Sequence, residues 1–234
     1  MISLSQKQVI LGGLLGDSSC SLKKAISFSH SEKQKEYLIW KSKFFNKENA
    51  VKSVYNVWNN KSYLRHYFCY YIKKEDELFF SFIRKNLYSN GRKKISLKYL
   101  NELSPLALAV WWMDDGCLSL SKGNRYGKWA TECFNYEEHL LMQKYFKEKW
   151  NINVQIKLEK GKYYFLRLNV TELKKLIKII YKYICEIPSM IYKIDLQYSY
   201  DKRIGVDFKE VYDYIKQSQY HKMLRNNYSI LFEL

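Results

Sequence analysis

The sequence has few residues that break regular structure, and few that crosslink a fold or bind soft metals. Two prolines and nine glycines among 234 residues argue against a long flexible linker. The cysteines lie far apart with no CxxC pair, at Cys20, Cys69, Cys117, Cys133 and Cys185. This pattern predicts reduced thiols, with no disulfide framework or zinc site. The four histidines are equally scattered, with no ligand-like neighbour at metal spacing, so we expect no metal held by soft ligands.

Long apolar runs are also absent. No stretch approaches the roughly 18 residues that are needed to cross a bilayer. The N-terminus, MISLSQKQVILGG, lacks the order of basic, apolar and cleavage regions of a secretory signal. We therefore expect an intracellular protein that is not secreted and has no membrane partner.

Positive charge and apolar residues are what the chain has in abundance. Hydrophobic residues make up 47%, and 40 basic against 23 acidic residues give a net charge of +17. The apolar fraction predicts a folded core. Because lysine and arginine recur along the whole chain, a polyanionic partner is favoured over a merely basic soluble protein. Charge alone leaves nucleic acid and anionic membrane open, and the lack of a spanning segment favours nucleic acid.

The pattern of expected elements occurs twice. Each half opens with an apolar helix, the first ending at Asp17 and the second covering 104–116 with Ser104 as N-cap and Pro105 in the first turn. Alternating strands and amphipathic helices follow. In the first half we expect strands in 21–30, a helix over 31–48, strands at 50–58 and 63–72, and a helix over 75–88. In the second half we expect strands at 117–123 and 128–134, a helix over 136–150, a hairpin over 152–170 turning at Gly161, and a helix from Thr171 to 184.

This order predicts an α+β protein of two pseudo-symmetric αββαββα repeats, residues 1–97 and 98–195, with residues 196–234 as a C-terminal extension. Each half supplies an antiparallel sheet that needs helices on one face and leaves the other face to solvent or a ligand. Two basic sheets side by side form a saddle that suits a DNA major groove, although each charge taken alone is more typical of a solvated strand position. The candidate DNA contacts are Lys23, Lys24, Arg65, Arg125, Lys128, Lys157 and Arg167.

Asp17 and Asp115 end matching helices. Small residues in those helices, namely Gly12, Gly13, Gly16, Ala107 and Ala109, let two helices approach closely and predict a helix pair between the halves. The two aspartates then lie side by side at the negative ends of both helix dipoles. Carboxylates placed there resist ionisation unless a cation joins them. A hard divalent ion such as Mg²⁺ meets that need, and it also activates water against a phosphodiester.

Two lysines stand at matching distances from these aspartates. Lys93 follows Asp17 by 76 residues, and Lys193 follows Asp115 by 78. A cation near the reacting phosphate stabilises the charge that develops there. Either lysine taken alone is equally compatible with an unrelated surface position, but the matched separations favour paired roles.

The segments ILGGLLGDS (10–18), LAVWWMDDG (108–116) and IPSMIYK (187–193) resemble the LAGLIDADG homing endonucleases, in the monomeric form with two repeats in one chain. The resemblance covers roughly residues 8–195. It implies that Asp17 and Asp115 bind metal, that the carbonyls of Gly16 and Asp114 complete the coordination, and that Lys93 and Lys193 are the active-site lysines. The family often has Lys-x-Ile-Pro where this chain has KKIS (93–96), so Lys94 is the alternative to Lys93. A second departure is Ser18, which stands where the family motif ends in glycine.

The resemblance implies a function as well. We expect a site-specific double-strand DNA endonuclease that uses Mg²⁺ or Mn²⁺, leaves short 3′ overhangs, and reads a long asymmetric target as a monomer. The partner is double-stranded DNA, with the chain's own intron RNA as a second candidate. The expected location is an organelle (mitochondrion or chloroplast) or a bacterial or phage-infected cytoplasm. An RNA-binding intron maturase and a non-cleaving DNA-binding protein are the alternatives, and neither needs both aspartates.

The pair Asp114–Asp115 is not expected to act as two equivalent ligands. Asp115 matches Asp17 of the first half, whereas Gly16 stands where Asp114 does. We therefore expect Asp114 to offer only its carbonyl to a metal. Its side chain is then left for water, for solvent on the DNA side, or for a neighbouring lysine.

Overall fold

The computed structural model describes residues 1–21, 25–58, 61–121 and 124–194. The first half contains α1 (Leu4–Leu15), β1 (Ser19–Ser21), β2 (Ala25–Ser31), α2 (Lys35–Lys43), β3 (Lys52–Trp58), β4 (Lys61–Tyr71) and α3 (Glu77–Leu87). The second contains α5 (Pro105–Asp115), β7 (Gly116–Ser121), β8 (Asn124–Trp129), α6 (Tyr136–Trp150), β9 (Gln155–Glu159), β10 (Tyr163–Leu168) and α7 (Val170–Ile184). The order αββαββα therefore occurs twice, and the predicted α+β fold class is confirmed.

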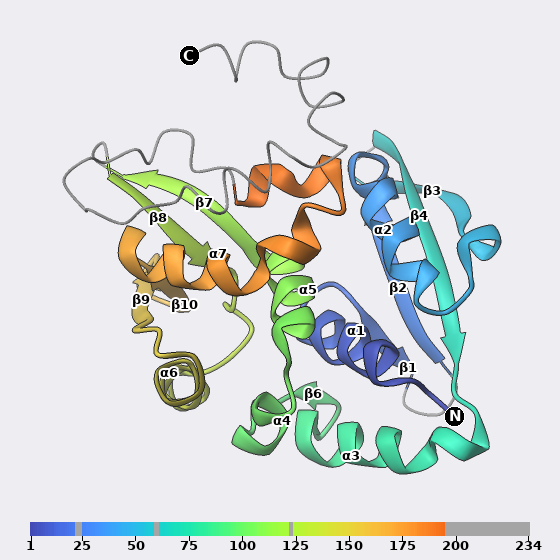
Figure 1. The fold of residues 1–234 in the computed structure, drawn as a ribbon, viewed down its shortest axis with the longest axis horizontal. Helices are drawn as coiled ribbons and strands as arrows, with labels where there is room; N and C mark the ends of the chain where they lie inside the picture. Colours follow the sequence, from blue (N-terminus) through green and yellow to red (C-terminus); the bar gives the residue numbers. More distant parts are fainter. Residues whose placement is uncertain (22–24, 59–60, 122–123, 195–234) are drawn as a thin grey trace.

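Each half builds one four-stranded antiparallel sheet with the same strand order, β1-β2-β4-β3 and β7-β8-β10-β9. Between the halves run a short ribbon of β5 (Tyr88–Ser89) and β6 (Arg92–Lys93) and the helix α4 (Leu97–Asn101). Figure 1 shows the two sheets on opposite sides of the molecule, with α1 and α5 between them. Strand alternation turns Ile26, Phe28 and His30 of β2 into the core, because successive side chains of a strand point to opposite faces.

Glycine permits the close contact between α1 and α5. A Cβ atom on Gly12 would lie 2.3 Å from the carbonyl oxygen of Ala107 and 2.9 Å from the Cβ of Val110. The helices cannot meet at this separation with any larger residue at position 12. The helix pair expected from the small residues is therefore present, and it joins the cores of the two halves.

Aromatic side chains fill the core of the second half. Trp111 and Trp112 of α5 both contact Trp129 of β8, with ring centroids 4.5 Å and 5.1 Å from that of Trp129. All three rings are fully buried. Aromatic rings bury large areas in few rotamers, so this cluster fixes α5 firmly against the second sheet.

Several local predictions were wrong. The strand expected at 128–134 ends at Trp129, and the chain then turns, with the N–H of Phe134 donating to the carbonyl of Thr131 at 3.0 Å. The helix expected over 31–48 is α-helical only in α2, between two short 3-10 turns. Asn169 caps α7 in place of the expected Thr171, because its side chain accepts a hydrogen bond from the N–H of Glu172.

The limits of the predicted domains stay a prediction. The boundary expected between residues 97 and 98 falls within the first turn of α4, a helix that packs against both α3 and α6. The C-terminal extension expected at 196–234 lies outside the described residues. Within the described part of the chain, no helix is long and apolar enough to span a membrane.

Candidate active site at the ends of α1 and α5

Asp17 and Asp115 stand at the ends of the two central helices. Asp17 follows Gly16, the C-cap of α1, and its side chain is about half exposed at 45%. Asp115 is the last residue of α5 and is partly buried. The chain therefore brings the two aspartates that sequence reasoning singled out to the same pair of helix termini.

Both carboxylates hold their negative charge at a cost. Burial, and after it the charges of Asp114 and Asp17, raise the pKa of Asp115 to about 8. Burial and Asp114 also raise the pKa of Asp17. Among the described residues, no lysine or arginine forms an ion pair with either carboxylate. This negative charge without a counter-ion, on oxygen donors, fits a hard divalent cation such as Mg²⁺.

A lysine reaches the end of each central helix. Lys93 Nζ, from β6, donates to the carbonyls of Gly16 at 3.1 Å and Ser18 at 3.4 Å. Lys193 Nζ donates to the carbonyl of Gly116 at 2.6 Å. Ser18 directly follows Asp17, and Gly116 directly follows Asp115, so the two lysines occupy equivalent places in the two halves.

Burial, partly offset by nearby negative charges, lowers the pKa of both Lys93 and Lys193. Lys94 is exposed, and its backbone N–H bonds the carbonyl of Leu87. Of the two lysines that the sequence left open, Lys93 is thus the one whose side chain reaches the helix terminus.

Asp114 behaves unlike its neighbour. Its side chain is fully buried, and Oδ1 accepts from Lys41 Nζ at 2.7 Å and from the Tyr37 hydroxyl at 2.8 Å. Oδ2 accepts from the backbone N–H of Asp17 at 3.2 Å. Three partners were expected for this side chain: water, solvent on the DNA side, or a neighbouring lysine. The structure shows the lysine, Lys41, and the burial of the side chain excludes bulk solvent.

His30 is the site residue that sequence reasoning missed. One ligand atom from each of Asp17, His30 and Asp114 lies within 4.8 Å of the others. The spacing of the histidines along the chain gave no sign of this neighbourhood, since separation along the chain does not predict what a sheet brings together. The available signal was strand alternation, which places His30 on the same inward face as Ile26 and Phe28.

Lys41 and the ring proton of His30 occupy the space among the side chains of Asp17, His30 and Asp114. Burial, and next Lys41, lower the pKa of His30 to about 3, so its ring is neutral near neutral pH. Lys41 Nζ donates to Nε2 at 3.0 Å, which assigns the ring proton to Nδ1. Nδ1 lies 3.2 Å from Gln34 Oε1 and 3.7 Å from Asp17 Oδ2. The free oxygen donors at the helix ends are accordingly those of Asp17 and Asp115.

The open face of the second sheet carries basic and aromatic side chains together. Lys157 is exposed, and Arg167 lies partly exposed with its guanidinium 4.4 Å from the ring centroid of Tyr126. Lys128, paired with Arg167 across the strands, forms ion pairs at 2.9 Å with both Glu132 and Glu159. The charge of Lys128 is thus balanced within the protein, whereas Lys157 and Arg167 present theirs outward.

The open face of the first sheet also carries basic side chains. Arg65 of β4 lies on it, between Ser31 of β2 and Val54 of β3. Lys52, paired with Tyr67, shares this face and was missed. For Arg125 the structure describes only the place of its backbone in β8. Lys23 and Lys24 lie outside the described residues.

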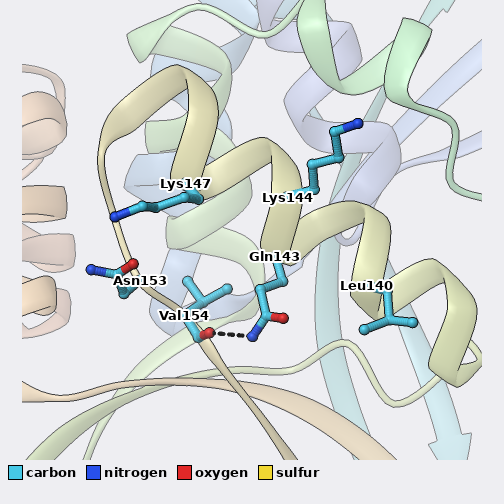
Figure 2. A pocket seen from close by; sticks show the side chains of 6 residues that line it. All are labelled: Leu140, Gln143, Lys144, Lys147, Asn153 and Val154. Atoms are coloured by element: carbon cyan, nitrogen blue, oxygen red, sulfur yellow. Dashed lines mark hydrogen bonds between the residues drawn. The ribbon is translucent and has the colours of Figure 1, made fainter.

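A cavity on the outer side of α6 is separate from this site. It has a volume of about 380 Å³ and is lined by Leu140, Gln143, Lys144, Lys147, Asn153 and Val154. Figure 2 shows these side chains around the C-terminal part of α6 and the loop that follows it, with Gln143 bonded to the carbonyl of Val154 at 2.8 Å. None of the predicted site residues lines it.

Comparison with known proteins finds the same pattern of elements elsewhere. Residues 7–176 match a family model described as the LAGLIDADG DNA endonuclease family. A solved structure, "The homing endonuclease I-WcaI bound to its DNA recognition sequence", is similar with a TM-score of 0.68 at 22% identity, over 83% of this chain and 87% of that one. At this identity the likeness shows the fold.

Curated relatives include two with maturase names. "Cytochrome b mRNA maturase bI2" of Saccharomyces cerevisiae is 34% identical over 60% of this chain and 30% of its own length. The protein of the same name from Debaryomyces hansenii is 29% identical over 80% of this chain and 72% of its own length. "Protein RecA" of Mycobacterium shimoidei is 30% identical over 51% of this chain and 28% of its own length. The chain thus spans about three tenths of the first relatives that it matches.

Proposed function

The chain belongs to the LAGLIDADG DNA endonuclease family, and from that premise we propose that it is a site-specific endonuclease that cuts both strands of DNA. The observation that carries the proposal is the paired arrangement at the ends of α1 and α5. Each half supplies one aspartate without a counter-ion and one lysine bonded to the carbonyl beside it. With two such sets, one aspartate and one lysine are available for each strand of a duplex.

Divalent metal is part of this proposal, because the donors at the site fit it. We propose that Asp17 and Asp115 hold Mg²⁺ or Mn²⁺ together with the backbone carbonyls of Gly16 and Asp114. When bound, such an ion supplies Lewis acidity and a more acidic water for attack on a phosphate. The protein's own contribution is position: the α1–α5 contact fixes the two carboxylates, and Lys93 and Lys193 place a positive charge where a phosphate gains negative charge.

Double-stranded DNA is the proposed partner. The open faces of the two sheets carry Arg65, Lys157 and Arg167, with Lys52 and several tyrosines beside them. Cations between aromatic rings suit a phosphate backbone and base edges. Because the two halves differ in sequence, we propose that a single chain reads a long asymmetric target and leaves short 3′ overhangs.

A second candidate function is intron maturation, which binds RNA. The observation in its favour is the name of the maturase relatives. The two functions are separated by the aspartates, since RNA binding gives no reason to retain two carboxylates with raised pKa values beside the partly buried Lys93 and the buried Lys193.

The decisive experiment is a cleavage selection. The purified chain is incubated with a library of duplex targets in Mg²⁺ and, separately, in EDTA, beside Asp115→Asn. We expect one asymmetric site to be cut in Mg²⁺ alone and the variant to be inactive. If the protein cuts no duplex in Mg²⁺ and binds its intron RNA in a separate binding assay, the maturase proposal replaces the endonuclease proposal.

A further inference from the structure

A charged cluster lies inside the interface between the two halves, directly beneath Asp17. Asp114 comes from α5 of the second half, whereas Lys41 and Tyr37 come from α2 of the first. The side chains of Lys41 and Asp114 are fully buried, and their charged atoms are 2.7 Å apart. This ion pair therefore connects the two halves at the place where the proposed catalytic groups meet.

Stability alone gives a weak reason for this cluster. Taking two charges out of water costs several kcal/mol per ion, and a well-packed apolar pair of the same volume is often at least as stable. The hydrogen bonds of Asp114 indicate another role. Oδ1 is taken by Lys41 and Tyr37, and Oδ2 accepts the backbone N–H of Asp17. The carboxylate thus contacts the chain at the residue whose side chain is the proposed metal ligand.

Close packing leaves this contact little freedom. A Cβ atom on Gly16 would lie 2.4 Å from the Cβ of Asp114 and 2.7 Å from its Oδ2. The side chain of Asp114 therefore lies against the bare backbone of α1, immediately before Asp17. His30 of β2 lies beside the carboxylate of Asp114 as well. Its ring accepts a hydrogen bond from Lys41 and faces Asp17 Oδ2 at 3.7 Å.

The second half is supported by different contacts. Gly16, at the end of α1, occupies the position that Asp114 occupies in α5, so it offers no side chain to the backbone of Asp115 as Asp114 does to that of Asp17. Trp112 supports this terminus: its ring would lie 2.2 Å from a Cβ on Gly116, and its indole N–H donates to the carbonyl of Lys193 at 2.9 Å. One terminus thus depends on an ion pair across the interface, and the other on an aromatic ring of its own half.

We propose that Asp114 is a positioning residue for Asp17 and that Lys41 and Tyr37 hold it in place. This inference rests on the proposed endonuclease function. It goes beyond that function by making the two halves unequal: loss of the Asp114 hydrogen bonds disturbs the set of groups built on Asp17 more than the set built on Asp115. The two strands of the target then respond differently to the same substitution.

The test uses a supercoiled plasmid that carries the selected target, with the wild-type chain as reference. Asp114→Asn keeps the shape of the side chain and removes its charge opposite Lys41. Because a displacement of about 1 Å at a catalytic group costs on the order of 100-fold in rate, we expect one strand to be cut roughly 10- to 100-fold more slowly. Nicked circles then accumulate, and end sequencing shows the same uncut strand every time. Tyr37→Phe, which removes one hydrogen bond, should give a smaller bias toward the same strand.

Asp76→Asn is the matched control. Asp76 is also a buried carboxylate that accepts from a backbone N–H (Ile2, 2.6 Å) and a tyrosine hydroxyl (Tyr70, 2.7 Å), but it lies before α3, outside the site. We expect Asp76→Asn to lower the melting temperature without any strand bias. The double variant Lys41→Met with Asp114→Asn removes both buried charges, and it should fold while keeping the bias.

A second measurement needs no cleavage. Mn²⁺ is titrated at high pH into a complex of the protein with an uncleavable DNA target, and its binding is followed by electron paramagnetic resonance. We expect one of the Mn²⁺ sites to bind more weakly in Asp114→Asn than in the wild type. Equal slowing of both strands by all Asp114 and Tyr37 variants, or unchanged Mn²⁺ binding, would overturn the positioning role. If the wild-type chain cuts no target at all, the endonuclease proposal itself fails, which is a distinct result.

Discussion

The stability of the metal-free protein should fall as the pH rises, and Asp115 should be a main cause. The pKa of Asp115 is raised from 3.8 to about 8, so the folded state binds a proton at this carboxyl more tightly than the unfolded chain does. A raised carboxyl pKa contributes stability that is fully present below the unfolded value and is lost as the pH rises through the folded value. Substitution to asparagine removes the titration and leaves the side-chain volume unchanged.

The size of the effect follows from the window. Each pH unit between the two pKa values costs about 1.4 kcal/mol for a single proton. From pH 6.5 to 8.5 the loss that Asp115 adds is therefore about 2 kcal/mol, which corresponds to about 4–8 °C in melting temperature for a chain of this size. The lower limit leaves out most of the range in which His30, with its pKa lowered from 6.5 to about 3, differs in charge between folded and unfolded states, and what remains is common to the wild type and Asp115→Asn.

The assay is thermal unfolding in EDTA at several pH values, for wild type and Asp115→Asn. Between pH 6.5 and 8.5 we expect the melting temperature of the wild type to fall by about 4–8 °C more than that of Asp115→Asn. Excess Mg²⁺ should flatten the wild-type curve, because a bound cation favours the charged form. Asp76→Asn is the control: burial raises the pKa of Asp76, but its hydrogen bonds outweigh that effect and lower the pKa below 3.8, so this variant's curve should run parallel to that of the wild type between pH 6.5 and 8.5. Parallel curves for wild type and Asp115→Asn would refute the reasoning.

Three further predictions concern packing, capping and chemistry. Gly12→Val should lower the free energy of unfolding by about 3 kcal/mol or more through overpacking, since even a Cβ atom there would be 2.3 Å from the carbonyl of Ala107; urea denaturation measures it, and an unchanged midpoint would contradict the close contact. Asn169→Ala should cost about 1 kcal/mol as a lost helix cap, whereas Thr171→Ala should be nearly neutral; equal effects in the same titration would reverse the assignment of the cap. Lys193→Met should slow cleavage of one strand by a factor on the order of 100 while DNA affinity, measured by fluorescence anisotropy, stays within about twofold, and equal slowing of both strands would argue against separate sets of groups.

Sequence reasoning reached the fold because the fold is written as a repeat. The spacing of apolar residues changes from the helix period to the strand period in the same order twice. Gly12 and Gly16 indicate a close contact between helices. Asp17, Asp115, Lys93 and Lys193 were chosen for their matched positions, and the structure places all four at the two helix ends. The predicted cap of α7 was wrong because a competing residue lies close by: Asn169, two residues before Thr171, caps the helix.

The cluster around Asp114 could not be predicted in the same way. Lys41 lies 73 residues from Asp114, and His30 lies 11 residues from Lys41, on elements whose sequence patterns give no sign that they meet. A lysine on an amphipathic helix is ordinarily solvated, and an Asp-Asp pair at a helix end reads as two similar carboxylates. The tertiary contacts make them different: Asp114 is paired with Lys41, and Asp115 has no lysine or arginine ion-pair partner among the described residues.

The sequence by itself determined the two repeats, the helix pair and the residues that close it, because periodicity, caps and small residues act over a few positions along the chain. Only the tertiary structure decided which aspartate keeps an unbalanced charge. That decision depends on the distance to a cation and on exclusion of water, and both are properties of how two halves pack. The asymmetry between Asp114 and Gly16 is visible in the sequence, but its consequence for Asp17 exists only once α1, α2 and α5 have met.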